Sequence, residues 1–296
     1  MKNSKLQQSL HILKILRKFA AVFELHIEMK QNFRNFEAYA LVTGAASGMG
    51  RIYSLRLAER GYNVILVDIN AKGLAETEEI IKAEIAASQT IDEKLKKNFM
   101  ILPVVQDLSV ADAADQIHAR TEAAGCEVEV LVNNAGVMYC QGIAETSERM
   151  LKLIMMVHMN TPLMLCRKYV GAMKERGCGY ILNISSLAAW MSWPGIGMYG
   201  NTKRFVRDHS RELRIECQKT GVSVTNAYFG AVDTPLIPLK DSLRKLARNL
   251  TVMITPEKAV KKALNATFRR RRGTMPGFLN KLFWPFIVIL PDCLLS

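Results

Sequence analysis

Residues 38–50 read AYALVTGAASGMG, an apolar run that leads directly into a glycine-rich turn. The run predicts a buried β-strand, and the segment RIYSLRLAERG at 51–61 has the pattern of a helix. Glycines between a strand and a helix permit a tight turn, and the helix N-terminus offers unpaired N–H groups to an anion. The stretch therefore predicts the start of a nucleotide-binding unit, although a glycine cluster alone can also be no more than a tight turn.

Short apolar runs alternate with amphipathic segments along the rest of the chain. The apolar runs predict strands at 62–68, 98–107, 128–136, 179–185 and 222–230. The amphipathic segments predict helices at 71–88, 111–125, 147–176 and about 199–220. Because parallel strands need crossover connections, the alternation predicts an α/β fold: one Rossmann-type, doubly wound parallel sheet with helices on both faces. We expect helical appendages at the N- and C-termini.

Composition and charge narrow the class of protein. The chain of 296 residues can bury a full core, and 49% of its residues are hydrophobic. The net charge of +13 is concentrated at the ends, with seven basic against three acidic side chains in residues 1–37 and eight against one in 258–296. The nearly neutral body argues against binding of nucleic acid. Six scattered cysteines suit a reducing cytoplasm, and neither they nor the five histidines have metal-ligand spacing.

Asp68 ends the second predicted strand, eighteen residues after Gly50. A carboxylate at this position can accept hydrogen bonds from the adenosine ribose hydroxyls and would repel a 2′-phosphate. Together with the glycines, Asp68 predicts a dinucleotide site and favours NAD(H). The basic residues Arg51 and Lys72 nearby leave NADP(H) open.

The spacing T-G-x-x-x-G-x-G at 43–50 resembles the short-chain dehydrogenase/reductase family, as do NNAG at 133–136, YGNTK at 199–203 and FGAVDT at 229–234. The resemblance covers roughly residues 38–265 and implies an NAD(P)-dependent catalytic domain. Met49 and Phe229 depart from the family's commoner isoleucine and proline, beside glycines that remain. The cofactor-binding residues that the resemblance implies are Thr43, Gly44, Ser47, Gly48, Met49, Gly50, Asp68, Asp107, Leu108, Asn134, Ala135, Gly136, Tyr199, Lys203, Gly230, Val232 and Thr234.

The resemblance also implies four catalytic residues, Asn160, Ser186, Tyr199 and Lys203. Ser186 has the family's separation of thirteen residues before Tyr199, which favours it over Ser185. A free tyrosine titrates near ~10, and we expect the Lys203 ammonium and the oxidised nicotinamide to lower the pKa of Tyr199, the acid/base. Lys203 would also bind the nicotinamide ribose. Ser186 would donate to the substrate oxygen, and Asn160 would hold a water that relays protons to Lys203.

The family places a mobile lid after Thr234, here at about 235–256. Apolar side chains in this segment and near the active-site loop favour a hydrophobic alcohol or ketone over a sugar, although some of them could simply pack against the body. A steroid, a long-chain keto-lipid such as a ketosphingoid base, and a retinoid-like molecule all fit. The apolar side chains are Trp190, Trp193, Leu236, Ile237, Leu239, Leu243 and Leu246.

The two ends of the chain share basic and apolar character. The extension at 1–37 has an amphipathic helical pattern, and the tail at 266–296 joins RRRR at 269–272 to an aromatic-rich end. The longest uncharged apolar run in the tail has nine residues, whereas a spanning helix needs about 20. Both ends could rest on an anionic membrane, at its inner face, or dock on the body or a partner. We expect a homo-oligomer.

Two other functions remain open. One is a catalytically silent protein that binds a dinucleotide as a sensor or scaffold, but such proteins usually lose the tyrosine or the lysine of the motif. The other is a sugar-nucleotide epimerase or dehydratase, which shares Tyr-x-x-x-Lys but normally has different glycine spacing and a larger C-terminal domain. The sequence favours the oxidoreductase over both.

Overall fold

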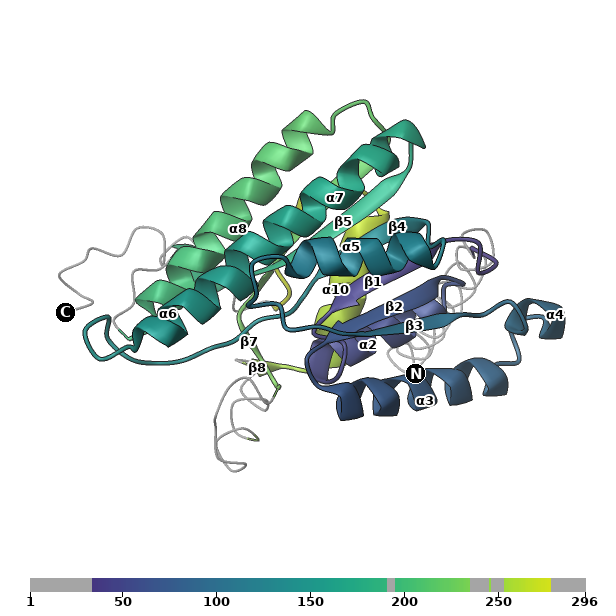
Figure 1. The fold of residues 1–296 in the computed structure, drawn as a ribbon, viewed down its shortest axis with the longest axis horizontal. Coiled ribbons are helices and arrows are strands. Elements are labelled where there is room, and N and C mark those ends of the chain that lie inside the picture. Colours follow the sequence, from purple (N-terminus) through teal and green to yellow (C-terminus); the bar gives the residue numbers. More distant parts are fainter. Residues whose placement is uncertain (1–33, 191–194, 235–244, 246–252, 278–296) are drawn as a thin grey trace, which may run out of the picture.

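A computed structural model describes residues 34–190, 195–234, 245 and 253–277 of the chain. Within these residues, seven strands form one parallel sheet in the order β3-β2-β1-β4-β5-β6-β9 (Figure 1). The strands are β1 (Tyr39–Thr43), β2 (Asn63–Asp68), β3 (Ile101–Val105), β4 (Val128–Asn133), β5 (Gly179–Ser186), β6 (Val222–Phe229) and β9 (Gly273–Thr274). This topology confirms the predicted doubly wound α/β fold.

Helices cover both faces of the sheet, with α5, α7 and α8 on one face and α2, α3 and α10 on the other (Figure 1). The helical elements are α2 (Gly48–Ala58), α3 (Ala71–Ala87), α4 (Glu93–Lys96), α5 (Ala113–Ala123), α6 (Glu148–Met155), the π-helical turn η1 (Met156–Asn160), α7 (Thr161–Glu175), the 3-10 turn η2 (Leu187–Trp190), α8 (Gly197–Glu216) and α10 (Pro256–Phe268). A separate two-stranded ladder pairs β7 (Ala231–Val232) with β8 (Met253–Ile254).

The buried hydrophobic residues form two clusters, one on each face of the sheet. Side chains alternate along the central strands and therefore contribute to the two clusters in turn. In β1, Ala40 and Val42 pack under α2, α3 and α10, whereas Leu41 packs under the helices of the opposite face. In β2, Leu66 and Val67 divide in the same way. A parallel sheet buried on both faces needs nearly continuous apolar strands, and this is the pattern of the predicted runs.

The strand order reverses at β1, which pairs with β2 on one side and with β4 on the other. Chain connections leave β1 and β4 toward opposite faces of the sheet, so a crevice opens outside the carboxyl ends of these two strands. Ligands of doubly wound folds bind at such a crevice. The glycine-rich turn after β1 and NNAG at the end of β4 both lie there.

The predicted long helix at 147–176 is interrupted in its middle. The turn η1 separates α6 from α7, and the Thr161 N–H donates to the Met156 carbonyl, five residues back. Pro162 has no N–H to give to the His158 carbonyl, and its ring would clash with that carbonyl in a regular α-helix. The wider π-helical turn avoids the clash, and such turns are frequent at functional sites.

Several elements near the C-terminal side were not predicted from the sequence, namely α10, the β7–β8 ladder and β9. Helix α10 crosses the predicted boundary at 265, and β9 adds a strand to the central sheet beyond it. Of the apolar side chains predicted in the lid and near the active-site loop, all but Trp190 lie outside the described residues, as do residues 1–33 and 278–296. Within the part of the chain that is described, no helix combines the length and apolar character needed to cross a bilayer.

Candidate active site

The turn between β1 and α2 depends on glycine at positions with different constraints. Gly44 and Gly48 have φ angles of 70° and 53°, in the left-handed region that favours glycine. A Cβ on Gly50 would stand 1.8 Å from the Gly44 carbonyl oxygen, so no larger residue fits there. A Cβ on Gly48 would meet nothing within 4 Å. The turn is therefore closely packed at Gly50 and open at Gly48.

A cleft of about 300 Å³ lies at the crevice between β1 and β4. Predicted cofactor residues supply most of its lining: Gly44, Ser47, Gly48, Met49, Asp68, Asp107, Leu108, Asn134, Ala135, Gly136 and Thr234. The remaining lining residues were not predicted from the sequence; they follow strands or lie on α6 and η1, and they are Ile69, Gln106, Val137, Leu153 and Val157. Their position at strand ends is the signal that could have found Ile69, Gln106 and Val137.

The remaining predicted cofactor residues do not line this cleft. Thr43 is buried, and its hydroxyl donates to the Val132 carbonyl (3.3 Å) and accepts from the N–H groups of Asn134 and Ala135 (3.0 Å each). The Asn134 side-chain amide donates to the Thr43 carbonyl at 2.9 Å. Thr43 thus joins the ends of β1 and β4 beneath the cleft. The other predicted residues outside the lining are Gly50, Tyr199, Lys203, Gly230 and Val232.

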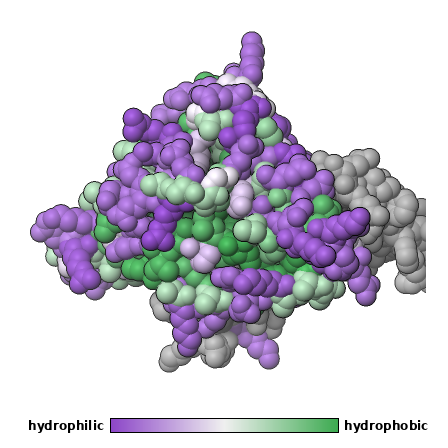
Figure 2. Space-filling model, turned by 45° about the vertical axis from the view of Figure 1, so that its right-hand side comes forward, coloured by the Kyte–Doolittle hydropathy of each residue, from purple (hydrophilic) through white to green (hydrophobic). Residues whose placement is uncertain are grey.

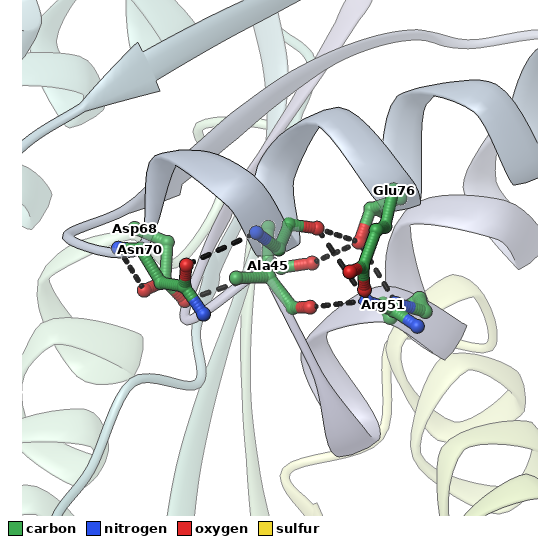
Figure 3. A network of polar contacts seen from close by, with 8 residues as sticks. Ala45, Arg51, Asp68, Asn70 and Glu76 are labelled. Carbon is green, nitrogen blue, oxygen red and sulfur yellow. Dashed lines mark hydrogen bonds and ion pairs between the residues drawn. The ribbon is translucent and has the colours of Figure 1, made fainter.

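The Asp68 carboxylate is fixed by two backbone N–H groups. Its Oδ2 accepts from Ala46 and its Oδ1 from Asn70, both at 3.0 Å. Arg51 lies on the other side of the turn, where its guanidinium donates to the Ala46 carbonyl (2.6 Å) and pairs with Glu76 (3.1 Å). Figure 3 shows Asp68 and Arg51 on either side of Ala45. Arg51 is therefore committed to holding α3 against the turn.

These features fit a dinucleotide. Ser47, the N-cap of α2, makes no side-chain cap hydrogen bond, so the first N–H groups of the helix stay available to an anion such as a pyrophosphate. Gly48 leaves open space beside them. The Asp68 carboxylate lines the same cleft and can accept from ribose hydroxyls. Phosphate, ribose and an aromatic base would each meet suitable groups, since the lining also includes Ile69, Asp107 and Leu108.

The two neighbouring serines at the end of β5 have different environments. The buried Ser185 hydroxyl donates to the Lys203 carbonyl at 2.8 Å, which joins the strand to α8. The Ser186 hydroxyl donates to the Phe229 carbonyl at 3.2 Å and lies close enough to the phenol of Tyr199 to influence its pKa. The structure thus brings Ser186 and Tyr199 together and assigns Ser185 a packing role.

Lys203 lies beside Tyr199 on α8, one helical turn further along. Its Nζ is 5.7 Å from the centroid of the Tyr199 ring and donates to the Ile184 carbonyl at 3.0 Å. Burial lowers the pKa of Lys203 from 10.5 to about 8, because the low-dielectric surroundings disfavour the ammonium. A Cβ on Gly136, which lines the cleft, would stand 3.7 Å from this Nζ.

In the protein without its cofactor, the pKa of Tyr199 is raised and not lowered as expected. Burial raises the pKa of Tyr199, and the neighbouring Ser186 hydroxyl opposes this only in part. The phenol of Tyr199 is therefore protonated at neutral pH. Asn160, the fourth predicted catalytic residue, is the last residue of η1 and is half-buried.

Comparison with known proteins identifies the family. Residues 38–243 match the family described as short chain dehydrogenase. The chain is 32% identical over 215 residues to (2S)-[(R)-hydroxy(phenyl)methyl]succinyl-CoA dehydrogenase subunit BbsD of Thauera aromatica, covering 72% of this chain and 81% of that protein. It is 30% identical over 210 residues to 17-beta-hydroxysteroid dehydrogenase type 3 of Mus musculus, covering 69% and 63%. It is 26% identical over 252 residues to the very-long-chain 3-oxoacyl-CoA reductase of Mycosarcoma maydis, covering 84% and 66%.

Solved structures share the fold at lower identity. The bulky-bulky ketone specific alcohol dehydrogenase of Comamonas testosteroni superposes with a TM-score of 0.70 at 23% identity, over 88% of this chain and 94% of the other. A short-chain dehydrogenase of Sphingobium yanoikuyae in complex with NADPH gives 0.70 at 22% identity, over 88% and 95%. A 3-oxoacyl-[acyl-carrier protein] reductase of Brucella melitensis with bound NAD gives 0.66 at 22%, over 81% and 88%.

The family match spans the glycine-rich turn, the cleft and the Tyr199–Lys203 turn. The strand order and the relatives agree with it. The chain therefore belongs to the short-chain dehydrogenase/reductase family and is an oxidoreductase that uses a nicotinamide dinucleotide.

Proposed function

We propose that this enzyme transfers hydride between NAD(H) and an apolar, steroid- or lipid-like secondary alcohol or its ketone. The observation that carries the proposal is the cluster of Ser186, Tyr199 and Lys203 next to a cleft that fits a dinucleotide. The nicotinamide ring supplies or accepts the hydride. The protein must then supply or accept a proton at the substrate oxygen.

Tyr199 is the proposed acid/base for that proton. Its phenol is protonated at neutral pH, since the ordinary pKa of tyrosine is already near ~10 and burial raises it further, and this suits a proton donor in the reducing direction. The Ser186 hydroxyl, which lies next to the phenol, would stabilise the negative charge that develops on the substrate oxygen. Lys203 would bind the nicotinamide ribose, and Asn160 would hold a water on the proton path to Lys203.

The proposed preference for NAD(H) is supported by the surroundings of Asp68. The carboxylate lines the cleft and would repel a 2′-phosphate. Arg51, one of the two basic residues that could bind such a phosphate, donates instead to the Ala46 carbonyl, Thr77 and Glu76. Lys72, exposed at the start of α3, is the remaining basic neighbour.

The proposed substrate class is supported by the apolar residues that the sequence places in and around the lid and by the activities after which several relatives are named. Those activities concern a hydroxysteroid, a very-long-chain 3-oxoacyl-CoA and bulky ketones. We propose further that the catalytic domain extends past residue 265 to include β9, since that strand pairs with β6. Of the predicted lid at about 235–256, only residues 245 and 253–256 are among the described residues.

A panel of ketones and alcohols, assayed with NADH, NADPH and their oxidised forms, tests the proposal. Steroid, long-chain 3-oxoacyl and retinoid substrates should be turned over, whereas sugar ketones of similar oxidation state should not. Binding of NADH without turnover of any of them would instead favour the silent sensor or scaffold. Turnover restricted to nucleotide sugars would favour the epimerase or dehydratase.

A further inference from the structure

His158 is buried in η1, with 1% of its surface exposed, and both of its ring nitrogens have partners on other elements. The Val137 N–H donates to Nε2 at 2.9 Å. Nδ1 lies 2.9 Å from the hydroxyl oxygen of Thr202. Val137 directly follows NNAG, and Thr202 lies in α8, so the imidazole joins two segments that are distant in sequence.

The partners determine the tautomer of the ring. A backbone N–H can only donate, so Nε2 of His158 must be unprotonated. The ring proton is then on Nδ1, which donates to the Thr202 oxygen. The Thr202 hydroxyl in turn donates to the Tyr199 carbonyl at 2.8 Å. A continuous hydrogen-bonded chain therefore runs from Val137 through a neutral imidazole to the backbone of Tyr199.

Both ends of this chain are at the candidate active site. Val137 lines the cleft together with Gly136. A Cβ on Gly136 would stand 3.0 Å from the His158 Nε2 and 3.7 Å from the Lys203 Nζ, so ring, cleft wall and ammonium are immediate neighbours. At the other end, Thr202 directly precedes Lys203 and bonds Tyr199, and the Tyr199 ring meets the imidazole edge-on with centroids 5.7 Å apart.

The π-helical turn holds the imidazole in place. Pro162 prevents regular α-helical bonding at His158, and the N–H of Thr161 reaches back to Met156 instead. The Thr161 hydroxyl donates to the Leu108 carbonyl at 2.8 Å, which anchors the turn to another residue of the cleft lining. The turn is thus fixed on both sides of the ring. Any buried histidine needs hydrogen-bond partners for its ring nitrogens, and here both partners, Val137 and Thr202, belong to segments that flank the candidate site.

We propose that His158 is a positioning residue that, through Thr202, sets the Tyr199–Lys203 turn of α8 against the cleft wall at Gly136 and Val137. The inference rests on the proposed roles of Tyr199 and Lys203. It predicts that loss of the His158–Thr202 bond shifts these two residues relative to the cofactor without unfolding the enzyme. Such a shift lowers both cofactor affinity and turnover, because a displacement of about 1 Å can cost a hundredfold in rate.

The matched variants Thr202→Val and Thr202→Ser test the bond, because valine has the shape of threonine without the hydroxyl and serine keeps the hydroxyl. We expect Thr202→Val to raise the dissociation constant for NADH, measured by titration calorimetry, by roughly three- to tenfold, as for one lost hydrogen bond. On a ketone substrate, kcat should fall by about tenfold or more, while Thr202→Ser stays within about twofold of the wild type. Equal NADH affinities in the two variants would overturn the proposal.

A double-mutant cycle separates positioning from packing. If His158 acts through Thr202, the double variant His158→Leu/Thr202→Val should bind NADH about as weakly as His158→Leu alone. If each residue merely packs, the two losses should multiply, which would contradict the proposal. Failure of every variant and of the wild type to turn over ketones would count against the proposed function only, because NADH binding is measured without a substrate.

The wild-type protein provides a test that needs no variant to fold. In histidine-labelled enzyme, ¹⁵N NMR should show the His158 ring as the neutral tautomer with its proton on Nδ1. The His158→Leu spectrum, or failing that His158→Asn, identifies the signal among the five histidines by its loss. A proton on Nε2, or a doubly protonated ring at neutral pH, is incompatible with donation from Val137 and would overturn the inference.

Discussion

Lys203 is a cation that the fold buries with one carbonyl, that of Ile184, as its hydrogen-bond partner. Its pKa falls to about 8 in the folded protein, from an ordinary value of 10.5. Below about pH 8 the folded protein holds a charge that the unfolded chain would solvate better, so the residue destabilises the fold there. The penalty fades as the pH rises from about 8 to 10.5, because only the unfolded chain then binds the proton.

Lys203→Met should therefore stabilise the enzyme at pH 7. The difference between 10.5 and about 8 corresponds to about 3 kcal/mol. The lost bond to Ile184 offsets about 1 kcal/mol, which leaves a net gain of about 2 kcal/mol. Urea unfolding should show this gain at pH 7 and its disappearance near pH 10.5, while turnover falls sharply. Lys94→Met, at an exposed position on α4, should show no such pH-dependent gain, and an equal gain there would refute the burial argument.

Tyr199→Phe should abolish turnover and leave cofactor binding intact, because only the transferable proton is lost. General acid–base catalysis contributes typically about 10²- to 10⁴-fold, so kcat should fall by roughly that factor. The dissociation constant for NADH should change by less than about threefold. Tyr180→Phe, in β5 beside Phe268, is the matched control and should keep wild-type rates. Near-wild-type kcat in Tyr199→Phe would remove the residue from the mechanism.

Asp68→Ala should narrow the preference for NADH over NADPH by about tenfold or more. The variant removes the repulsion between the carboxylate and a 2′-phosphate, whose free energy we expect to be at least that of one charged hydrogen bond. Ratios of kcat/KM for the two cofactors measure this preference. Arg51→Gln serves as the comparison, because Arg51 already pairs with Glu76 and the Ala46 carbonyl. If Arg51→Gln selectively weakened NADPH, the guanidinium would be a phosphate ligand after all.

At the scale of elements, the β1–α2 turn needs glycine for two different reasons: lack of space at Gly50 and a positive φ angle at Gly48. Gly50→Ala would place a Cβ 1.8 Å from a backbone oxygen, and we expect a loss of at least about 3 kcal/mol in unfolding free energy. Gly48→Ala meets no atom but has a φ of 53°, so its cost should be only about 1–2 kcal/mol. Because Gly48 lines the cleft, NADH affinity should fall more than stability does.

Gly171→Ala is the control for these two variants. Gly171 is in α7 and has an ordinary φ, and a methyl group added there would meet open space, so alanine should stabilise the helix by up to about 1 kcal/mol. Thermal unfolding of the three variants should give the order Gly171→Ala, Gly48→Ala, Gly50→Ala from most to least stable. A Gly50→Ala protein as stable as Gly48→Ala would mean that the turn can open.

The elements that the sequence predicted are those with a local signal. Apolar runs predicted the central strands because a sheet covered on both faces buries every residue of a strand. The π-helical turn η1 was not predicted. Pro162 indicates that the helix is disturbed near this point, but not that the Thr161 N–H bonds to the Met156 carbonyl. The strand β9 has only two residues, Gly273 and Thr274, and is defined by pairing with β6 rather than by any pattern of its own.

The candidate site likewise has features that the sequence predicted and features that depend on the tertiary fold. The family motifs predicted which residues lie at the cleft, and most of the predicted cofactor residues do line it. The direction of the pKa of Tyr199 was not predictable, because it depends on how much of the surrounding protein excludes water. The role of His158 was not predicted for a related reason. Its partners, Val137 and Thr202, are brought to it only by the tertiary fold.

At the scale of the whole molecule, charge and apolar surface are unevenly distributed. Basic residues outnumber acidic ones by seven to three in residues 1–37 and by eight to one in 258–296, whereas the body is nearly neutral. Figure 2 shows hydrophobic residues gathered in the middle of one face, framed by hydrophilic ones. Some of the terminal charge already has partners within the fold, since Arg270 donates to the Gly221 carbonyl at 2.7 Å. The charge of the two ends could still attract an anionic surface.

If the two ends bind anionic lipid, the full chain should co-sediment with vesicles that contain phosphatidylserine and not with neutral vesicles. Binding should fall as salt rises, because the Debye length shortens to about 3 Å at 1 M. A chain limited to residues 34–277, which keeps β9 and its pairing with β6, should stay in solution. Retention at high salt would indicate apolar insertion as the main contribution. Equal sedimentation of the two chains would instead leave docking on the body, or self-association, as the role of the ends, and size-exclusion chromatography of the same pair would separate those two.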